Sequence, residues 1–287
     1  MTAQGQFGMV QVGGRVQFVE TIPRNGARPV LHVADHPTLG AVRFDLDGAR
    51  FGMQGMRGVL LGTSGSGKSY ALGVIAEEAH RVGLPFVIFD QESEYLGLGA
   101  LQGTQVVEVA GAGDGFGALV EFVLCDGGGL VLDVGELSLV DQRAVFVGFV
   151  AKFYKTAKRL RRRCLFFVDE AAEVAPQRKM RGADLSREWA ERLARRGRKV
   201  GINWWMASQR PGDLDKSVYA QANVKLLGRI EIINDYQAIR PYLSRRIALA
   251  ELARLDVGHF VLDIQGRSEM VQVRGRRTED LGGTPRE

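Results

Sequence analysis

The sequence predicts an α/β fold in which a mainly parallel sheet is flanked by helices. Short apolar runs alternate with helical patterns from Val59 onward, and this alternation is typical of a parallel sheet covered on both faces. A glycine-rich stretch, residues 62–69, lies between the first apolar run and the first helical pattern. The chain has 287 residues, of which 45% are apolar, so it can bury a large core and wholesale disorder is excluded.

The apolar runs define the expected strands of this sheet. Buried strands are predicted at residues 58–61, 85–90, 106–109, 130–134, 164–169, 202–208 and 224–227. Helical periodicity predicts helices at residues 70–82, 141–160 and 185–196. Two later runs, at 260–263 and 270–273, flank Gly266 and predict an antiparallel hairpin.

Composition divides the chain into three parts. Residues 1–57 are rich in glycine and short alternating runs, which predicts a short β-rich extension with a hairpin (9–12 and 16–19) and a strand at 41–44. Residues 58–273 are expected to form the main α/β domain. Residues 274–287 mix charge, glycine and proline, so we expect a disordered tail there.

Residues 62–69 read Gly-Thr-Ser-Gly-Ser-Gly-Lys-Ser and fit the phosphate-binding loop pattern. Glycines let the backbone approach an anion closely, and the following helix directs its positive dipole end toward the same place. Lys68 can reach the β- and γ-phosphates, and the Ser69 hydroxyl can bind Mg²⁺. A ligand-free glycine turn before a helix is the alternative. The residues expected to contact a nucleotide are Gly62, Thr63, Ser64, Gly65, Ser66, Gly67, Lys68, Ser69 and Tyr70.

Two adjacent carboxylates follow the most apolar of the predicted strands. Asp169 is expected to hold Mg²⁺ together with Ser69, since strand ends beside the glycine loop are where the metal is held. Glu170 points in a different direction and can act as the general base for an attacking water. A small-molecule kinase would also use a phosphate loop, but this acidic pair suits water as the nucleophile.

A third strand, at 202–208, ends in Ser-Gln-Arg-Pro. Ligand sites lie at the carboxyl ends of parallel strands, so Gln209 can sense the γ-phosphate at the same edge of the sheet. The alternative is that Gln209 is a helix cap or turn residue.

The ordered set of motifs resembles the HerA/FtsK superfamily of DNA-pumping ATPases, and it is closer to the HerA branch. The motifs, beyond the glycine loop, are Phe-Asp-Gln-Glu-Ser-Glu-Tyr at 89–95, Val-Asp-Glu-Ala at 168–171, Ala-Arg-Arg-Gly-Arg-Lys-Val-Gly at 194–201 and Ser-Gln-Arg-Pro at 208–211. The resemblance extends from about Val59 to Ile239. It implies a RecA-like P-loop ATPase core that binds ATP and Mg²⁺ and assembles into a homo-oligomeric ring, expected to be a hexamer, around double-stranded DNA.

The resemblance also assigns site residues. It implies that Asp90 lies near the nucleotide. It also implies that Asp90, like Lys68, Glu170 and Gln209, takes part in catalysis. It further implies that Arg198, or Arg195 as the second choice, reaches into a neighbour's site. An arginine finger is typically worth ~10³–10⁵ in rate. The alternative for these arginines is a solvated helix end favoured by the macrodipole.

The segment before the loop is shorter than the β-barrel usual in HerA proteins. The chain therefore also resembles compact viral genome-packaging members of the superfamily. A nuclease, or a capsid or portal protein, is accordingly an open partner, and a protein-coupled secretion or defence ATPase of the same superfamily is a further alternative.

The net charge of +5 fits a polyanionic partner. The sequence contains two basic runs, at 155–163 and 177–182. The second is expected to form a loop that lines the pore of a ring and contacts DNA phosphates without reading bases. For the first run, the alternative is a solvated helix end. Cys125 and Cys164 have no metal-ligand spacing. No apolar run approaches the ~20 residues that span a bilayer, and no signal-peptide pattern is present, so we expect a cytoplasmic protein with no membrane partner.

Overall fold

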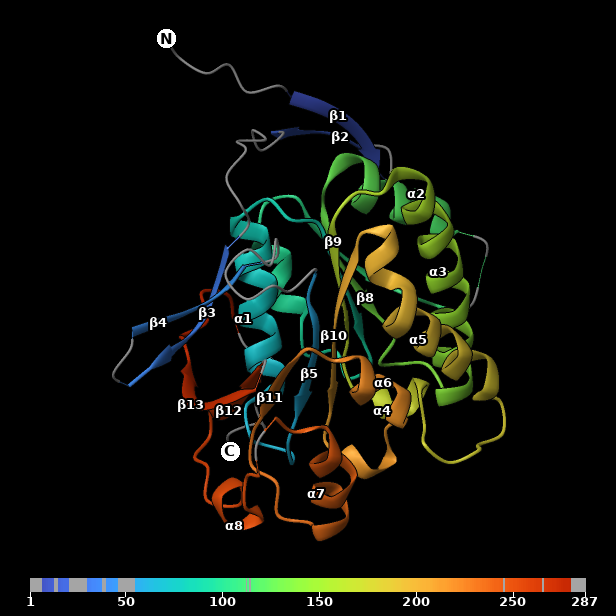
Figure 1. The fold of residues 1–287 in the computed structure, drawn as a ribbon. Helices are drawn as coiled ribbons and strands as arrows, with labels where there is room; N and C mark the ends of the chain where they lie inside the picture. Colours follow the sequence, from blue (N-terminus) through green and yellow to red (C-terminus); the bar gives the residue numbers. More distant parts are fainter. Residues whose placement is uncertain are drawn as a thin grey trace, which may run out of the picture.

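The computed structural model describes residues 7–12, 15–20, 30–37, 40–45, 55–111, 113, 115–244, 246–264 and 266–279. These residues form one large sheet with helices on both faces and a separate two-stranded hairpin (Figure 1). Among them, no helix is both long and apolar enough to cross a membrane.

The large sheet has eleven strands in the order β4-β3-β13-β12-β11-β5-β10-β9-β6-β8-β7. The run from β11 to β7 is parallel, and the strands from β4 to β12 continue it antiparallel. The strands are β3 (Val30–His36), β4 (Gly40–Asp45), β5 (Arg57–Leu61), β6 (Phe86–Asp90), β7 (Thr104–Glu108), β8 (Gly129–Asp133), β9 (Cys164–Val168), β10 (Ile202–Ser208), β11 (Val224–Leu227), β12 (His259–Ile264) and β13 (Arg267–Val273).

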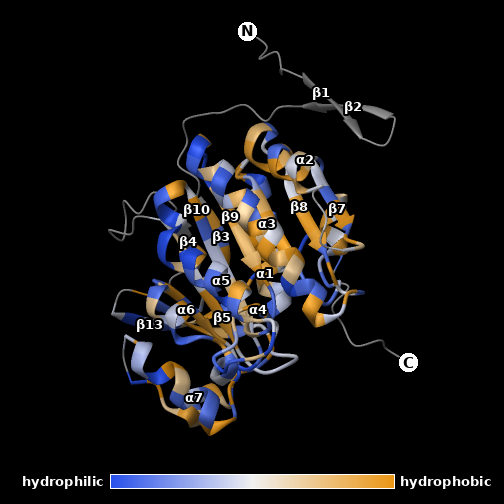
Figure 2. Cartoon of the chain, turned by 90° about the vertical axis from the view of Figure 1, so that its right-hand side faces the viewer, coloured by the Kyte–Doolittle hydropathy of each residue, from blue (hydrophilic) through white to orange (hydrophobic). Residues whose placement is uncertain are grey.

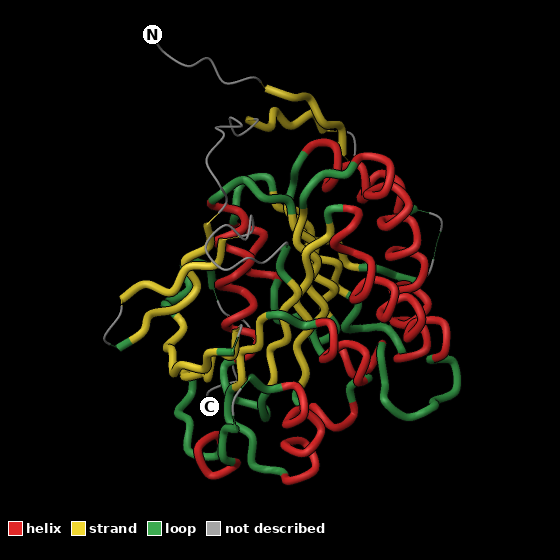
Figure 3. The backbone as a smooth tube through the Cα atoms, viewed as in Figure 1, coloured by secondary structure: helices red, strands yellow, loops and turns green. Residues whose placement is uncertain are grey.

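The helices cover this sheet on two sides, as the red and yellow tube of Figure 3 shows. The α-helices are α1 (Lys68–Arg81), α2 (Phe116–Glu121), α3 (Leu139–Leu160), α4 (Ala171–Val174), α5 (Asp184–Arg196), α6 (Lys216–Gln221), α7 (Ile233–Ile239) and α8 (Leu249–Leu252). Short 3₁₀ turns lie at η1 (Leu96–Ala100), η3 (Gly197–Val200), η4 (Pro211–Asp213) and η5 (Arg240–Tyr242), and a π turn, η2 (Phe122–Asp126), follows α2.

The central strands are buried on both faces because their apolar residues alternate between two cores. Trp204 packs with α3 and α5 on one face, whereas the next residue, Trp205, packs with α1 on the other. In the same way, Leu61 packs on the face of Trp204 and Leu60 on the face of Trp205, because side chains alternate along a strand. Figure 2 shows the hydrophobic colour on strands β8 and β9. Doubly buried parallel strands therefore explain the continuous apolar runs of the sequence.

The predicted fold class is confirmed, and the strands and helices expected between 58 and 273 are present with end shifts of a few residues. The amino-terminal hairpin is also present, as β1 (Phe7–Val12) paired with β2 (Arg15–Glu20), although Gly13 and Gly14 lie outside the described residues. Strand β3 was not expected. It pairs with β13 and packs on α1, so part of the predicted extension belongs to the main sheet.

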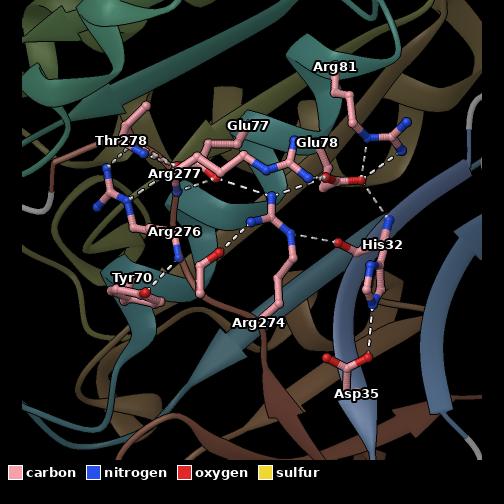
Figure 4. A network of polar contacts seen from close by, with 11 residues as sticks. His32, Asp35, Tyr70, Glu77, Glu78, Arg81, Arg274, Arg276, Arg277 and Thr278 are labelled. Atoms are coloured by element: carbon pink, nitrogen blue, oxygen red, sulfur yellow. Dashed lines mark hydrogen bonds and ion pairs between the residues drawn. The ribbon is translucent and has the colours of Figure 1, made fainter.

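Residues 274–279, which we call the strap, lie across α1, whereas the sequence predicted disorder from residue 274 (Figure 4). Arg274 Nη2 lies 3.1 Å from Glu77 Oε2 and 3.1 Å from Glu78 Oε1, and both carboxylates are buried. The backbone N–H of Thr278 donates to Glu77 Oε1 at 2.8 Å, and that of Arg276 donates to the Tyr70 hydroxyl at 2.6 Å. The composition predicted a disordered tail, because composition does not show that the buried carboxylates of α1 need the hydrogen-bond donors of residues 274–279.

Buried carboxylates on α1 make the strap a structural part of the domain. Burial raises the pKa of Glu78, but hydrogen bonds from Arg81 and from the His32 N–H, with the charges of Arg81 and Arg274, outweigh it and lower the pKa overall. Glu78 is thus held as an anion. Arg274 also donates to the His32 carbonyl at 3.2 Å and so connects the strap, α1 and β3.

Arg274→Ala is expected to destabilise the domain strongly. Removing one partner of a buried ion pair leaves an uncompensated charge, which costs about 3–5 kcal/mol. Urea titrations measure this loss as a lower free energy of unfolding, provided that its dependence on urea concentration (the m-value) stays unchanged. Arg277→Ala is the matched control in the same strap, because its side chain is 59% exposed and its ion pair with Glu78 spans 3.7 Å. That variant should lose less than about 1 kcal/mol. Equal losses in both variants would contradict the role given to Arg274.

Candidate nucleotide and metal site

The glycine loop at 62–69 is anchored on three neighbouring segments. The Thr63 N–H donates to the Arg229 carbonyl at 2.7 Å, and the Gly62 N–H donates to the Ser208 carbonyl at 3.3 Å. The Gly258 N–H donates to the Ser66 carbonyl at 3.1 Å. Connections following β11 and β10 and preceding β12 therefore fix the loop at the carboxyl edge of the parallel strands.

Two glycines of the loop have left-handed backbones. Gly65 has φ 70° and Gly67 has φ 92°. A Cβ on Gly67 would lie 3.1 Å from the Gly258 nitrogen, whereas a Cβ on Gly65 would meet nothing within 4 Å. Gly67 is also the N-cap of α1 and supplies no side-chain acceptor, so the first amides of the helix remain for an anion.

Lys68 extends from the first turn of α1 into the space between the loop and a group of acids. Its side chain is almost fully buried, and its Nζ donates to the Thr63 carbonyl at 3.2 Å. Burial lowers its pKa, and the charges of Glu170 and Asp169 oppose this effect. The buried ammonium is therefore close enough to the two strand-end carboxylates to interact with their charges.

Asp169 and Glu170 follow β9 and diverge. Asp169 is 1% exposed; its Oδ2 accepts from the Tyr95 hydroxyl at 2.6 Å and its Oδ1 from the Glu170 N–H at 2.9 Å. Glu170 has φ 40°, an uncommon value for a residue with a side chain, and it is the N-cap of α4. This turn directs the Glu170 carboxylate to the Gln209 N–H, which donates to Oε2 at 3.3 Å.

The electrostatics around Glu170 suit proton transfer. Burial raises its pKa to about 7, the charge of Asp169 adds to this, and Lys68 and hydrogen bonds from Gln209 oppose it. A carboxylate with a pKa near neutrality can accept a proton from water more readily than an exposed one. Gln209 thus lies at the site, as expected, and contacts the predicted base.

Asp90 ends β6 and is fully buried, but its carboxylate serves the backbone of the following loop. It accepts from the N–H groups of Glu92 at 3.3 Å, Glu94 at 3.2 Å and Tyr95 at 2.9 Å. Burial nevertheless raises its pKa to about 7, against these hydrogen bonds. This geometry favours a role in holding the loop over the direct catalytic role that the sequence suggested.

The loop after β6 brings two side chains to the site that sequence reasoning left without a role. Burial raises the pKa of Glu94 to about 7, and the nearby Ser69 side chain opposes this rise. The Oε2 of Glu94 is buried with no hydrogen-bond partner among the described residues. Tyr95 binds Asp169. The acidic spacing at 90–94 was the available signal, but only the fold shows which acid reaches Ser69.

Three predicted residues are placed elsewhere. Arg198, in η3, lies beside Gly55 ahead of β5, and this is the amino edge of the parallel strands, opposite the glycine loop. Arg195 is exposed near the same edge and pairs with Glu191 across 2.9 Å. The Tyr70 hydroxyl accepts the Arg276 N–H of the strap. Neither arginine is therefore part of the site within its own subunit.

The residues present fit a divalent cation bound with a nucleotide. The Ser69 hydroxyl and the Asp169 carboxylate are hard oxygen ligands of the kind that Mg²⁺ prefers. The buried Glu94 oxygen without a partner among the described residues is an acceptor that a nearby cation or its bound water would satisfy. Among the described residues, no group of three or more His, Cys, Asp or Glu side chains forms a metal site alone. Mg²⁺ usually takes its remaining ligands from phosphates and water, so the small protein set is in keeping with such an ion.

A parallel sheet with this glycine loop and acidic strand end defines the chain as a P-loop NTPase. Residues 56–217 match the model of the family described as "Helicase HerA, central domain", and the chain belongs to this family.

The sequence relatives match in part. The DNA double-strand break repair helicase HerA of Saccharolobus solfataricus is 36% identical over 81 residues, which are 27% of this chain and 16% of that protein. Protein P9 of Pseudoalteromonas phage PM2 is 29% identical over 89 residues, or 31% of this chain and 37% of P9. The matched segments thus cover well under two thirds of these relatives.

Solved structures share the fold at low identity. VirB4 of Thermoanaerobacter pseudethanolicus has a TM-score of 0.69 and 15% identity, covering 88% of this chain and 98% of that one. The genome packaging NTPase B204 of Sulfolobus turreted icosahedral virus 2, in complex with AMPPCP, has a TM-score of 0.52 and 19% identity, covering 75% and 94%.

Gly67→Ala is expected to damage the loop more than Gly65→Ala. Both place a side chain at positive φ, which costs about 1–2 kcal/mol. Only the Gly67 substitution also presses a Cβ on the Gly258 backbone. Urea unfolding should therefore show a larger loss of stability for Gly67→Ala. Equal losses would mean that the Gly258 segment gives way, and the anchoring of the loop by this segment would be refuted.

Proposed function

We propose that the chain is an ATP-hydrolysing motor that moves double-stranded DNA through a ring of identical subunits. One observation carries the proposal: the buried Lys68 ammonium, hydrogen-bonded to the glycine loop, is close enough to Asp169 and Glu170 for their charges to oppose the lowering of its pKa by burial. A cation, a metal-binding acid and a poised base around a phosphate cradle are what hydrolysis of a triphosphate requires.

Each group has a defined part in the reaction. The loop amides and Lys68 hold the β- and γ-phosphates. Ser69 and Asp169 would bind Mg²⁺, which neutralises phosphate charge when it is present with ATP. Glu170 accepts the proton of the attacking water, because its pKa of about 7 is matched to this task. Gln209, hydrogen-bonded to Glu170, would connect this reaction to the motif that follows β10.

The loop at 177–182 is the proposed contact with DNA. Arg178, Lys179 and Arg181 are exposed on it. The loop follows α4, directly downstream of Glu170, and the Gln177 N–H donates to the Asp213 carbonyl at 2.6 Å. A change at the nucleotide can thus reach the loop through α4 and through the segment after Gln209. The other basic run, 155–163, lies at the opposite edge of the sheet and is a weaker candidate.

A ring would unite the two edges of the sheet. Arg198 and Arg195 lie on the edge away from their own glycine loop, so they can act only on the nucleotide of another subunit. A guanidinium fork matches the charge that develops on a transferring phosphate. We infer a homo-oligomeric ring, a hexamer by family resemblance, with a nuclease or a capsid or portal protein as a further partner.

A genome-packaging or protein-coupled secretion ATPase is the second candidate. The similarity to phage protein P9 and the fold shared with a genome packaging NTPase favour it. The nucleotide chemistry would be the same in each case, and only the moved polymer or coupled partner would differ. Stimulation of hydrolysis by double-stranded DNA separates a DNA motor from a protein-coupled ATPase.

ATP hydrolysis by the assembled protein is expected to rise severalfold with double-stranded DNA and to require Mg²⁺. Phosphate release with and without DNA, alongside native mass, measures both the activity and the assembly. If double-stranded DNA does not change the rate of ATP hydrolysis by the assembled ring, the protein-coupled alternative is favoured.

Lys68→Ala should abolish nucleotide binding, whereas Glu170→Gln should retain binding and lose at least 100-fold in turnover, since general bases contribute roughly 10²–10⁴. Unaltered turnover in Glu170→Gln would remove Glu170 as the base.

Arg198→Ala is expected to inhibit wild-type subunits in mixed assemblies. If the arginine acts in trans, each variant subunit disables a neighbour's site, so activity should fall more steeply than the wild-type fraction. Lys199→Ala is the control, because this exposed cation lies in the same turn. Activity in direct proportion to the wild-type fraction would show that Arg198 does not act across an interface.

A further inference from the structure

We propose that Tyr95 and Glu94 are positioning residues that orient Asp169 and Ser69, the two groups expected to bind Mg²⁺. The inference rests on the proposed nucleotide function and goes beyond it. It assigns roles to the loop after β6, where the Tyr95 hydroxyl donates to Asp169 and the buried Glu94 carboxylate, one oxygen of which has no partner among the described residues, lies near Ser69.

Tyr95 fixes the Asp169 carboxylate. Its side chain is fully buried, and its hydroxyl donates to Asp169 Oδ2 at 2.6 Å, the short distance of a charge-assisted hydrogen bond. The Glu170 N–H holds the other oxygen at 2.9 Å. With one donor on each oxygen the carboxylate cannot rotate freely, and each oxygen keeps a lone pair for a cation.

Glu94 acts on Ser69 in a complementary way. A serine hydroxyl has one proton and two lone pairs, so a nearby carboxylate that accepted the proton would leave the oxygen free to bind a metal. The second carboxylate oxygen of Glu94 is buried and has no hydrogen-bond partner among the described residues. An unpartnered buried acceptor is costly, and a nearby cation or its bound water would satisfy it.

Asp90 explains why the loop can hold this geometry. Three backbone N–H groups, those of Glu92, Glu94 and Tyr95, converge on its buried carboxylate. Glu94 and Tyr95 are thus attached by their own backbones to the end of β6. Beyond them, the Leu98 N–H donates to the Tyr95 carbonyl at 3.0 Å and starts η1. The loop is therefore a rigid support and not a flexible cover.

The test is a Mg²⁺ titration of the binding of a fluorescent ATP analogue, with the binding in EDTA as the metal-free reference. Loss of a residue that orients a metal ligand typically costs 10- to 100-fold in metal affinity. Tyr95→Phe should therefore raise the half-saturating Mg²⁺ concentration at least ~10-fold. Binding in EDTA should equal that of the wild type, because the glycine loop and Lys68 are unchanged.

Tyr236→Phe is the matched control. Tyr236 is also buried, and its hydroxyl donates one hydrogen bond, to the Ile247 carbonyl at 2.7 Å, outside the described contacts of the nucleotide site. It should lose comparable thermal stability yet keep the wild-type Mg²⁺ titration. A Tyr95→Phe titration that overlays the wild-type curve would overturn the positioning role.

Glu94 provides a second, independent variant if Tyr95→Phe does not fold. Glu94→Ala should raise the half-saturating Mg²⁺ concentration, and Glu94→Gln should restore part of the loss, since an amide oxygen still accepts the Ser69 proton. Equal titrations for Glu94→Ala and the wild type would overturn the role of Glu94. A wild-type protein that shows no Mg²⁺-dependent nucleotide binding would instead refute the proposed function.

Discussion

The site depends on the balance between one buried ammonium and a group of buried carboxylates. Lys68 loses hydration in its position, and the charges of Glu170, Asp169 and Glu94 compensate for it in part. The carboxylates of Glu170 and Glu94 in turn have raised pKa values because they are buried and close to other acids. Buried negative charge beside a phosphate-binding loop is a state that a bound Mg²⁺ would relieve.

The same logic of buried charge holds the helix that carries Lys68. At its start, α1 is fixed through the glycine loop, and toward its end the carboxylates of Glu77 and Glu78 are matched by the strap. Arg274 joins the strap to both acids and to β3. The antiparallel part of the sheet, which the strap follows, thereby braces the nucleotide-binding helix.

The residues of the proposed function lie at two edges of one sheet. The carboxyl edge of the parallel strands gathers Lys68, Asp169, Glu170 and Gln209, while Arg198 lies at the amino edge. A single subunit cannot bring these edges together, because β5 and β10 separate them. Assembly is thus the physical requirement for an arginine to act on a nucleotide, and this connects the proposed ring to the proposed chemistry.

The sequence by itself determined the parallel sheet, the glycine loop and the acidic strand end, because these depend on local patterns of apolar residues and on fixed spacing. Only the tertiary structure decided the roles of residues whose partners are distant in the chain. Asp90 turned out to serve the backbone of its own loop, while Tyr95 reaches Asp169, 74 residues away. The strap was misjudged for the same reason, since its order comes from buried acids about 200 residues earlier in the chain, at Glu77.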